Sequence, residues 1–133
     1  GMTTALLRQY RSICREIEEK EDELSGYIAF DTVAGSGNEF PFTKHAVKVG
    51  GVVPGKENAE RLRDIAELKR TRYAVERFVA GIPDSMTRRV FEWRYIRGGR
   101  APSWRAIAVR IGGTSEDAVK KTVYRYLKNS SKK

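Results

Sequence analysis

Two stretches with heptad spacing constrain the fold of this 133-residue chain more than any other feature of its sequence. In residues 3–24 the repeated positions are apolar with one exception, and they are Leu6, Tyr10, Ile13, Ile17, Lys20 and Leu24. In residues 57–82 the repeated positions are Ile65, Leu68, Arg72, Val75, Val79 and Ile82. Spacings that alternate between three and four residues predict long helices, each with one apolar face.

Neither helix can bury such a face alone, so we expect the two to pack against each other as a long antiparallel coiled-coil pair. The first helix is expected to end at Ser25 and Gly26, because glycine commonly follows the last turn of a helix. Three heptads are about the minimum for a coiled coil in water. A homodimer through these helices is therefore compatible with the pattern without being required by it.

The segment 25–55 connects the two helices and has a different pattern. Residues 27–30 and 46–49 are rich in β-formers, with turn residues between them, and this predicts an extended or β-hairpin crossover. A segment of this length without regular structure would be unusual in a compact domain, so we expect it to be functional or packed against a partner. The single histidine, His45, has no second type of metal ligand nearby, so no catalytic or metal role is expected for it.

Composition argues against several classes of protein. A single cysteine, Cys14, rules out an internal disulfide, and together with one histidine it cannot build a Cys₂His₂ zinc site. No run approaches the roughly 20 apolar residues of a transmembrane helix, and the N-terminus lacks the apolar stretch of a signal peptide, so a soluble intracellular protein is expected. The sequence has no glycine-rich phosphate loop, nucleophile motif or metal-ligand spacing, so we expect neither an enzyme nor a cofactor.

A short helix is predicted directly after the second long helix. The residues Gly81 to Ser85 end the long helix, and Asp84 or Ser85 is the expected N-cap of the next one. This next helix covers residues 86–97 and holds a large set of aromatic residues for its length. Such a set is typical of a helix with a compact core around it.

Two more helices are predicted near the C-terminus. One covers residues 104–111, with Ser103 as its N-cap and two glycines after it. The other covers residues 115–128, with Thr114 as its N-cap and Asp117 as the second member of a capping box. The residues of these helices that are expected to face the core are Ile107, Ala108, Ile111, Val119, Val123, Tyr126 and Leu127.

The last fifty residues carry the positive charge. Residues 84–133 hold 13 Lys and Arg against 4 Asp and Glu, a net charge of +9 that equals the net charge of the whole chain. The segments 1–24, 25–55 and 56–83 carry −2, 0 and +2. This asymmetry predicts a polyanionic partner, nucleic acid before membrane, because the charges are spread through a structured region without a lipid-binding face. The alternative is a basic surface that only adds solubility.

Two short helices joined by a glycine-containing turn, the second of them basic, are typical of a helix-turn-helix. A helix fits the major groove of DNA, its first turns reach base edges, and Lys or Arg further along neutralise phosphates. The pattern predicts a three-helix DNA-binding domain at 84–133, preceded by a helical hairpin at 2–83 with an insertion at about 27–55. The alternative is a three-helix module that binds proteins.

Several short patterns resemble those of a known family. They are Arg88-Arg89-Val90-Phe91-Glu92-Trp93-Arg94-Tyr95-Ile96-Arg97-Gly98, Ser103-Trp104-Arg105-Ala106-Ile107-Ala108, Ile111-Gly112 and Ser115-Glu116. Residues 82–127 resemble in this way the region-4 helix-turn-helix of sigma-70-like proteins. The chain is more narrowly similar to phage and prophage regulators of the ArpU/RinA type, which place a charged coiled-coil pair ahead of this module. Residues 31–45 resemble a further segment of such phage proteins.

The resemblance implies sequence-dependent binding of double-stranded DNA in the bacterial cytoplasm and control of phage gene transcription, with RNA polymerase as a further partner. Matched position by position, it implies that base edges are read by Ser115, Glu116, Asp117, Lys120 and Lys121. It implies contacts with the DNA backbone by Arg105, Tyr124 and Arg125. The family commonly has acidic residues after the Ser-Trp pair, where this chain has Arg105 and Ala106. If this face meets DNA, the change favours higher affinity for phosphate.

A second function, from a different class, fits the same predicted elements. The small subunit of a phage terminase, a component of the DNA-packaging machinery, also joins a helix-turn-helix to coiled-coil helices. It assembles into a ring, so the mass of the protein in solution separates the two hypotheses. A large ring would favour packaging, whereas a monomer or dimer would favour regulation.

Overall fold

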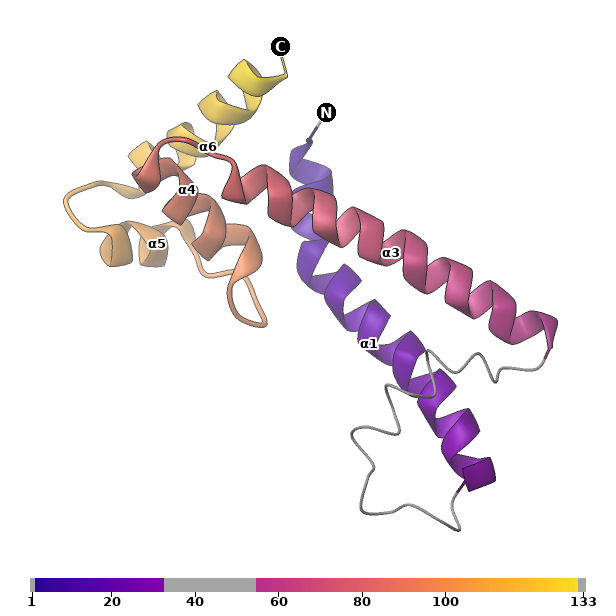
Figure 1. Ribbon diagram of the computed structural model, residues 1–133. Helices are drawn as coiled ribbons and strands as arrows, with labels where there is room; N and C mark the ends of the chain where they lie inside the picture. Colours follow the sequence, from indigo (N-terminus) through magenta and orange to yellow (C-terminus); the bar gives the residue numbers. More distant parts are fainter. Residues whose placement is uncertain (1, 33–54, 132–133) are drawn as a thin grey trace. The chain divides into compact units, whose positions relative to one another are not determined.

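The computed structural model describes residues 2–32 and 55–131 (Figure 1). The helical elements are, in chain order, α1 (Thr4–Thr32), α3 (Lys56–Ala80), α4 (Ser85–Phe91), the π-helical turn η2 (Glu92–Ile96), α5 (Trp104–Ile111) and α6 (Glu116–Ser130). No β-strand occurs within these described ranges. The prediction of a mainly α-helical fold is therefore confirmed for this part of the chain.

The described residues form two compact units. Unit 1 contains residues 2–13 and 71–131, and unit 2 contains residues 14–32 and 55–70. This division differs from the predicted boundary at 83/84, because α1 and α3 each contribute residues to both units. The first turns of α1 therefore belong with the three C-terminal helices, a grouping that the sequence pattern does not indicate.

The first helix is longer than predicted. It does not end at Ser25 and Gly26 but continues to Thr32, so the prediction of β structure at 27–30 is wrong. A glycine inside a helix costs only about 1 kcal/mol relative to alanine. A single glycine is therefore a weak stop signal where helical hydrogen bonding can continue past it. Residues 33–54 of the predicted crossover, including His45, lie outside the described residues.

Unit 2 combines the C-terminal part of α1 with the N-terminal part of α3. Its buried side chains at predicted heptad positions are Ile17, Leu24 and Ile65. Glu21 pairs with Lys69 at 2.8 Å, and Glu23 pairs with Arg61 at 3.3 Å, so ion pairs connect the two helices within this unit. Burial at these heptad positions agrees with the predicted pattern, while the coiled-coil packing itself stays a prediction.

The core of unit 1 receives side chains from the first part of α1, the last part of α3, α4, η2, α5 and α6. Its side chains with no exposed surface are Val75, Val90, Phe91, Ile107, Val119 and Val123. The rings of Phe78, Phe91 and Tyr126 pack edge to face, with centroids 5.6 to 6.1 Å apart, and so join the end of α3 to α4 and α6. Of the residues predicted to face this core, Ile111 and Tyr126 are half-buried and the other five are buried.

The helix α4 begins at one of its two predicted N-caps. The carboxylate of Asp84 accepts hydrogen bonds from the backbone N–H (2.9 Å) and the hydroxyl (2.8 Å) of Thr87. These two bonds, the backbone one first, lower the pKa of Asp84 below its ordinary value. The helix predicted at 86–97 is α-helical only to Phe91, because η2 follows as a π-helical turn before the chain leaves the helix at Arg97.

Candidate nucleic-acid interface

A short turn joins α5 to α6 within unit 1. α5 follows Ser103, whose Oγ accepts a hydrogen bond from the backbone N–H of Ala106 at 3.0 Å, and its bounds match the prediction to the residue. The next residues, Gly112 and Gly113, have φ values of +82° and +66°. Residues with a side chain rarely adopt such values, so the two glycines allow the chain to change direction in the four residues before α6.

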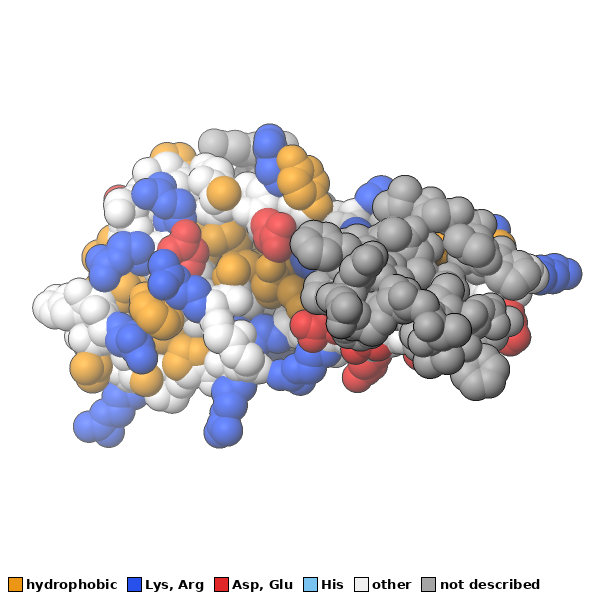
Figure 2. Space-filling model, turned by 60° about the horizontal axis from the view of Figure 1, so that its bottom comes forward, with side chains coloured by type: hydrophobic (Ala, Val, Ile, Leu, Met, Phe, Trp, Pro, Cys, Tyr) orange, Lys and Arg blue, Asp and Glu red, His pale blue; other side chains and the backbone are white. Residues whose placement is uncertain are grey.

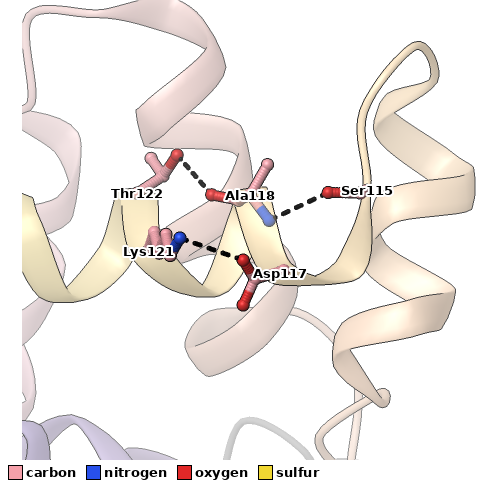
Figure 3. A network of polar contacts seen from close by, with 5 residues as sticks. All are labelled: Ser115, Asp117, Ala118, Lys121 and Thr122. Atoms are coloured by element: carbon pink, nitrogen blue, oxygen red, sulfur yellow. Dashed lines mark hydrogen bonds and ion pairs between the residues drawn. The ribbon is translucent and has the colours of Figure 1, made fainter.

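The N-cap of α6 is Ser115 and not Thr114. Its Oγ accepts a hydrogen bond from the backbone N–H of Ala118 at 3.1 Å (Figure 3). The predicted capping box of Thr114 and Asp117 is therefore wrong. A cap at Ser115 places Asp117 one position too early to complete the box, and its carboxylate instead pairs with Lys121 at 3.1 Å.

The helix α6 has one buried face and one outer face. The buried face consists of Val119, Val123 and Leu127. The outer face carries the remaining predicted site residues of this helix, which are Glu116, Asp117, Lys120, Lys121, Tyr124 and Arg125. All of these are exposed except Lys120, which is half-buried. Tyr124 is 42% exposed, so its aromatic ring is accessible to a partner.

Positive charge on this surface is largely uncompensated. Arg105 at the start of α5, and Lys120 and Arg125 on α6, form no hydrogen bond or ion pair through their side chains with any residue that the structure describes. Lys121 differs, because Asp117 neutralises it in an ion pair whose side chains are 65% and 73% exposed. Such an exposed pair contributes at most about 1 kcal/mol and opens easily. The surface can therefore offer several cations to an anionic partner.

An aromatic contact links the start of α5 to the outer face of α6. The ring centroids of Trp104 and Tyr124 are 6.3 Å apart, and the guanidinium carbon of Arg94 lies 4.0 Å from the centre of the Trp104 ring. Arg94 also donates a hydrogen bond from Nη1 to the carbonyl oxygen of Pro102 at 2.8 Å. Neither Arg94 nor Trp104 is among the predicted site residues, although alternating arginine and aromatic residues are a signal by which they could be found.

A shallow cleft borders the outer face of α6 on the side of α4. It has a volume of about 200 Å³ and is lined by Thr87, Thr122, Arg125, Tyr126 and Asn129. The hydroxyl of Thr122 is used within α6, because it donates to the carbonyl oxygen of Ala118 at 2.9 Å (Figure 3). The side chains of Arg125 and Asn129 have no hydrogen-bond partner in the described part of the chain. Both can therefore donate hydrogen bonds to an anion at this edge of the helix.

The charge is spread over a broad surface of unit 1. Figure 2 shows Lys and Arg side chains scattered over the face of the α4, α5 and α6 region, at the left of the view, with few Asp or Glu side chains between them. Surface charge of one sign raises the local concentration of an oppositely charged partner and speeds its association. This distribution is compatible with a polyanion.

In the ranges that the structure describes, no group of three His, Cys, Asp and Glu side chains could hold a metal ion. Of the helices described, none has the length and apolar character needed to cross a membrane. Comparisons with protein-family models, with curated proteins and with solved structures found no significant match to this chain.

Proposed function

We propose that this protein is a DNA-binding transcriptional regulator of phage or prophage origin, and that α5 and α6 form a helix-turn-helix. The observation that carries the proposal is the outer face of α6, where Lys120 and Arg125 have no partner among the described residues and Val119 anchors the opposite face in the core. An α-helix fits the major groove, and cations on its surface bind by neutralising phosphates.

In the proposed complex, the first turns of α6 read base edges. The residues that face the bases are Ser115, Glu116, Asp117, Lys120 and Lys121. The ammonium of Lys120 also neutralises a phosphate beside the groove, because it is a cation without a partner among the described residues. Carboxylates accept from the amino group of cytosine, and lysine donates to guanine. The exposed ion pair of Asp117 and Lys121 opens at little cost, so both side chains can turn to the DNA.

The residues around the reading helix bind the backbone. Arg105, Tyr124 and Arg125 contact phosphates on either side of the groove, which sets the register of the protein without specifying sequence. A homodimer through the long helices would present two copies of α6 to DNA. Dimers of this kind bind half-sites about 34–36 Å apart, so the expected target is a palindrome. The same proposal places the protein in the cytoplasm of the bacterial host and includes a contact with RNA polymerase.

Selection of double-stranded DNA from a random pool by the full chain tests the proposal. We expect a recurrent sequence, and a palindrome if the protein is a dimer. The variant Lys120→Ala/Lys121→Ala, with its helix content checked by circular dichroism, should lose this enrichment. The control Arg63→Gln/Arg89→Gln removes two exposed charges elsewhere and should recover the same site as the wild type.

Two results would overturn the proposal. One is the recovery of no preferred sequence by a folded wild-type chain. The other is a large ring in solution, measured by mass, which would favour the DNA-packaging hypothesis.

A further inference from the structure

Arg11, a residue of α1, binds the C-terminal end of η2. The guanidinium of Arg11 donates to the carbonyl oxygens of Trp93 (Nη2, 3.2 Å), Arg94 (Nη1, 2.8 Å), Arg97 (Nη2, 2.7 Å) and Gly98 (Nε, 3.2 Å). These carbonyls belong to η2 and to the loop directly after it, where a helix leaves its last acceptors without partners in the helix. Arg11 therefore caps the C-terminal end of η2 from a distant part of the sequence.

The neighbours of Arg11 hold α1 in place within unit 1. Leu7, Tyr10 and Ile13 are buried, and the hydroxyl of Tyr10 donates a hydrogen bond to the carboxylate of Glu76 on α3. The guanidinium is thus carried by a turn of helix that is itself anchored. An anchored donor loses less conformational entropy when it binds the four carbonyls than a mobile side chain would.

The contacts of Arg94 extend from this cap to the outer face of α6. Its backbone carbonyl accepts from Arg11, while its side chain binds the carbonyl of Pro102 and lies over the ring of Trp104. The Trp104 ring in turn contacts that of Tyr124. A continuous set of contacts therefore runs from α1 through η2 and α5 to a side chain that is proposed to touch DNA.

We propose that Arg11 is a positioning residue of the DNA-binding unit. It holds the end of η2 and the loop to α5, and through Arg94 and Trp104 it sets the position of Tyr124 on the outer face of α6. This inference rests on the proposed function, because its consequence for affinity requires that α6 binds DNA. Arginine is needed at this position because its planar fork can reach several carbonyls at once, whereas the ammonium of a lysine is a single point.

The chain contains two tryptophans, and both lie on this set of contacts. The carbonyl of Trp93 accepts from Arg11, and the ring of Trp104 packs under Arg94. Substitution Trp93→Phe leaves Trp104 as the single tryptophan. Its fluorescence and its quenching by acrylamide then report the packing at the start of α5 without any DNA present.

The experiment uses the full chain in the Trp93→Phe background. Arg11→Gln and Arg11→Lys should both increase acrylamide quenching of Trp104. Both should also weaken binding to the selected DNA by about tenfold, which corresponds to the loss of about one charged hydrogen bond. The salt dependence of binding should stay at the wild-type value, because no phosphate contact is removed. The control Arg8→Gln removes an exposed charge from the same helix and should match the wild type in every measurement.

Arg94→Gln is a second variant, and it tests the inference even if the Arg11 variants fold poorly. It keeps the backbone carbonyl that accepts from Arg11 but removes the side chain that lies over Trp104, so it should reproduce the rise in quenching and the loss of affinity. All measurements are made at a temperature at which circular dichroism shows each variant to be fully folded. Loss of stability alone then leaves both readouts at the wild-type value.

Three results would decide against the inference or against the proposed function. Unchanged quenching and affinity in folded Arg11→Gln would overturn the positioning role and leave the proposed function intact. A smaller salt dependence in Arg11→Gln would also overturn it, because Arg11 would then contact phosphate directly. A wild-type chain that binds no DNA would overturn the proposed function, while quenching of Trp104 would still decide whether Arg11 orders the start of α5.

Discussion

The proposed binding of DNA should depend on salt through two cations on the outer face of α6. Replacing Lys120 and Arg125 with glutamine removes two positive charges that have no partner among the described residues. Glutamine is a good helix former, and the substitutions leave the buried face at Val119 and Val123 untouched, so the fold is expected to remain. The perturbation therefore changes the electrostatic part of binding with little change in the structure of the helix.

The magnitude follows from how many phosphates the variant no longer neutralises. Each neutralised phosphate contributes about −0.9 to the slope of the logarithm of affinity against the logarithm of salt concentration. Removing both cations should make the slope less steep by about 1.8. When salt is raised from about 50 to 200 mM, the affinity of the variant should therefore fall about twelvefold less than that of the wild type.

Fluorescence anisotropy with a labelled DNA duplex, repeated over this range of salt, measures both slopes. The control Arg63→Gln/Arg89→Gln lowers the net charge by the same amount at exposed positions outside α6, and it should keep the wild-type slope. A change below about half a unit in Lys120→Gln/Arg125→Gln would refute the proposed phosphate binding by these two side chains. Equal changes in the two variants would show that net charge, and not the outer face of α6, governs binding.

Three further predictions concern the stability of unit 1. In urea denaturation, Ile107→Ala should lower the free energy of unfolding by about 2–5 kcal/mol because Ile107 has no exposed surface, whereas Val109→Ala, at a position 76% exposed on the same helix, should change it by less than about 0.5 kcal/mol. Gly112→Ala should lower the free energy of unfolding by about 1–2 kcal/mol because the φ of Gly112 is +82°. Gly99→Ala should be nearly neutral, because a Cβ added there has no neighbouring atom within 4 Å and the φ of Gly99 is not positive. Equal melting temperatures of the two variants would contradict this. Because the pKa of Asp84 is lowered in the folded protein, its carboxylate stabilises the fold above its unfolded-state pKa of about 4, and this stabilisation is lost as the pH falls through the folded-state pKa. Thermal unfolding of Asp84→Asn below about pH 4 should therefore depend less on pH than that of the wild type.

Helix ends that depend on local chemistry could be predicted where one residue alone fits the signal. α5 has its predicted bounds because Ser103 and Gly112 act on backbone groups within one turn of the helix. The start of α6 could not be predicted to the residue, because Thr114 and Ser115 satisfy the same pattern. The choice depends on the backbone, since Ser115 is extended, with φ −106° and ψ 162°, and its Oγ reaches the N–H of Ala118.

The outer face of α6 could also be predicted, because helical periodicity separates it from the buried face. The pairing of its charges is only partly visible in the sequence. Asp117 and Lys121 are four residues apart, a spacing at which side chains meet on a helix. The absence of a partner for Lys120 and Arg125 among the described residues depends instead on which side chains α4 and α5 bring near them, and periodicity does not contain that information.

The contacts of Arg11 could not be predicted from the sequence at all, because its partners lie 82 to 87 residues away. Beside the heptad position of Tyr10 it resembles any solvated arginine of a long helix, and its partners are backbone carbonyls, which have no sequence signature. A fragment that begins at residue 84 would retain every side chain predicted to touch DNA, yet it would leave four carbonyls at the end of η2 without this guanidinium. If Arg11 positions the start of α5, the smallest chain that binds DNA at full affinity has to include α1 at least as far as Arg11. In that case the predicted boundary at 83/84 divides one physical unit.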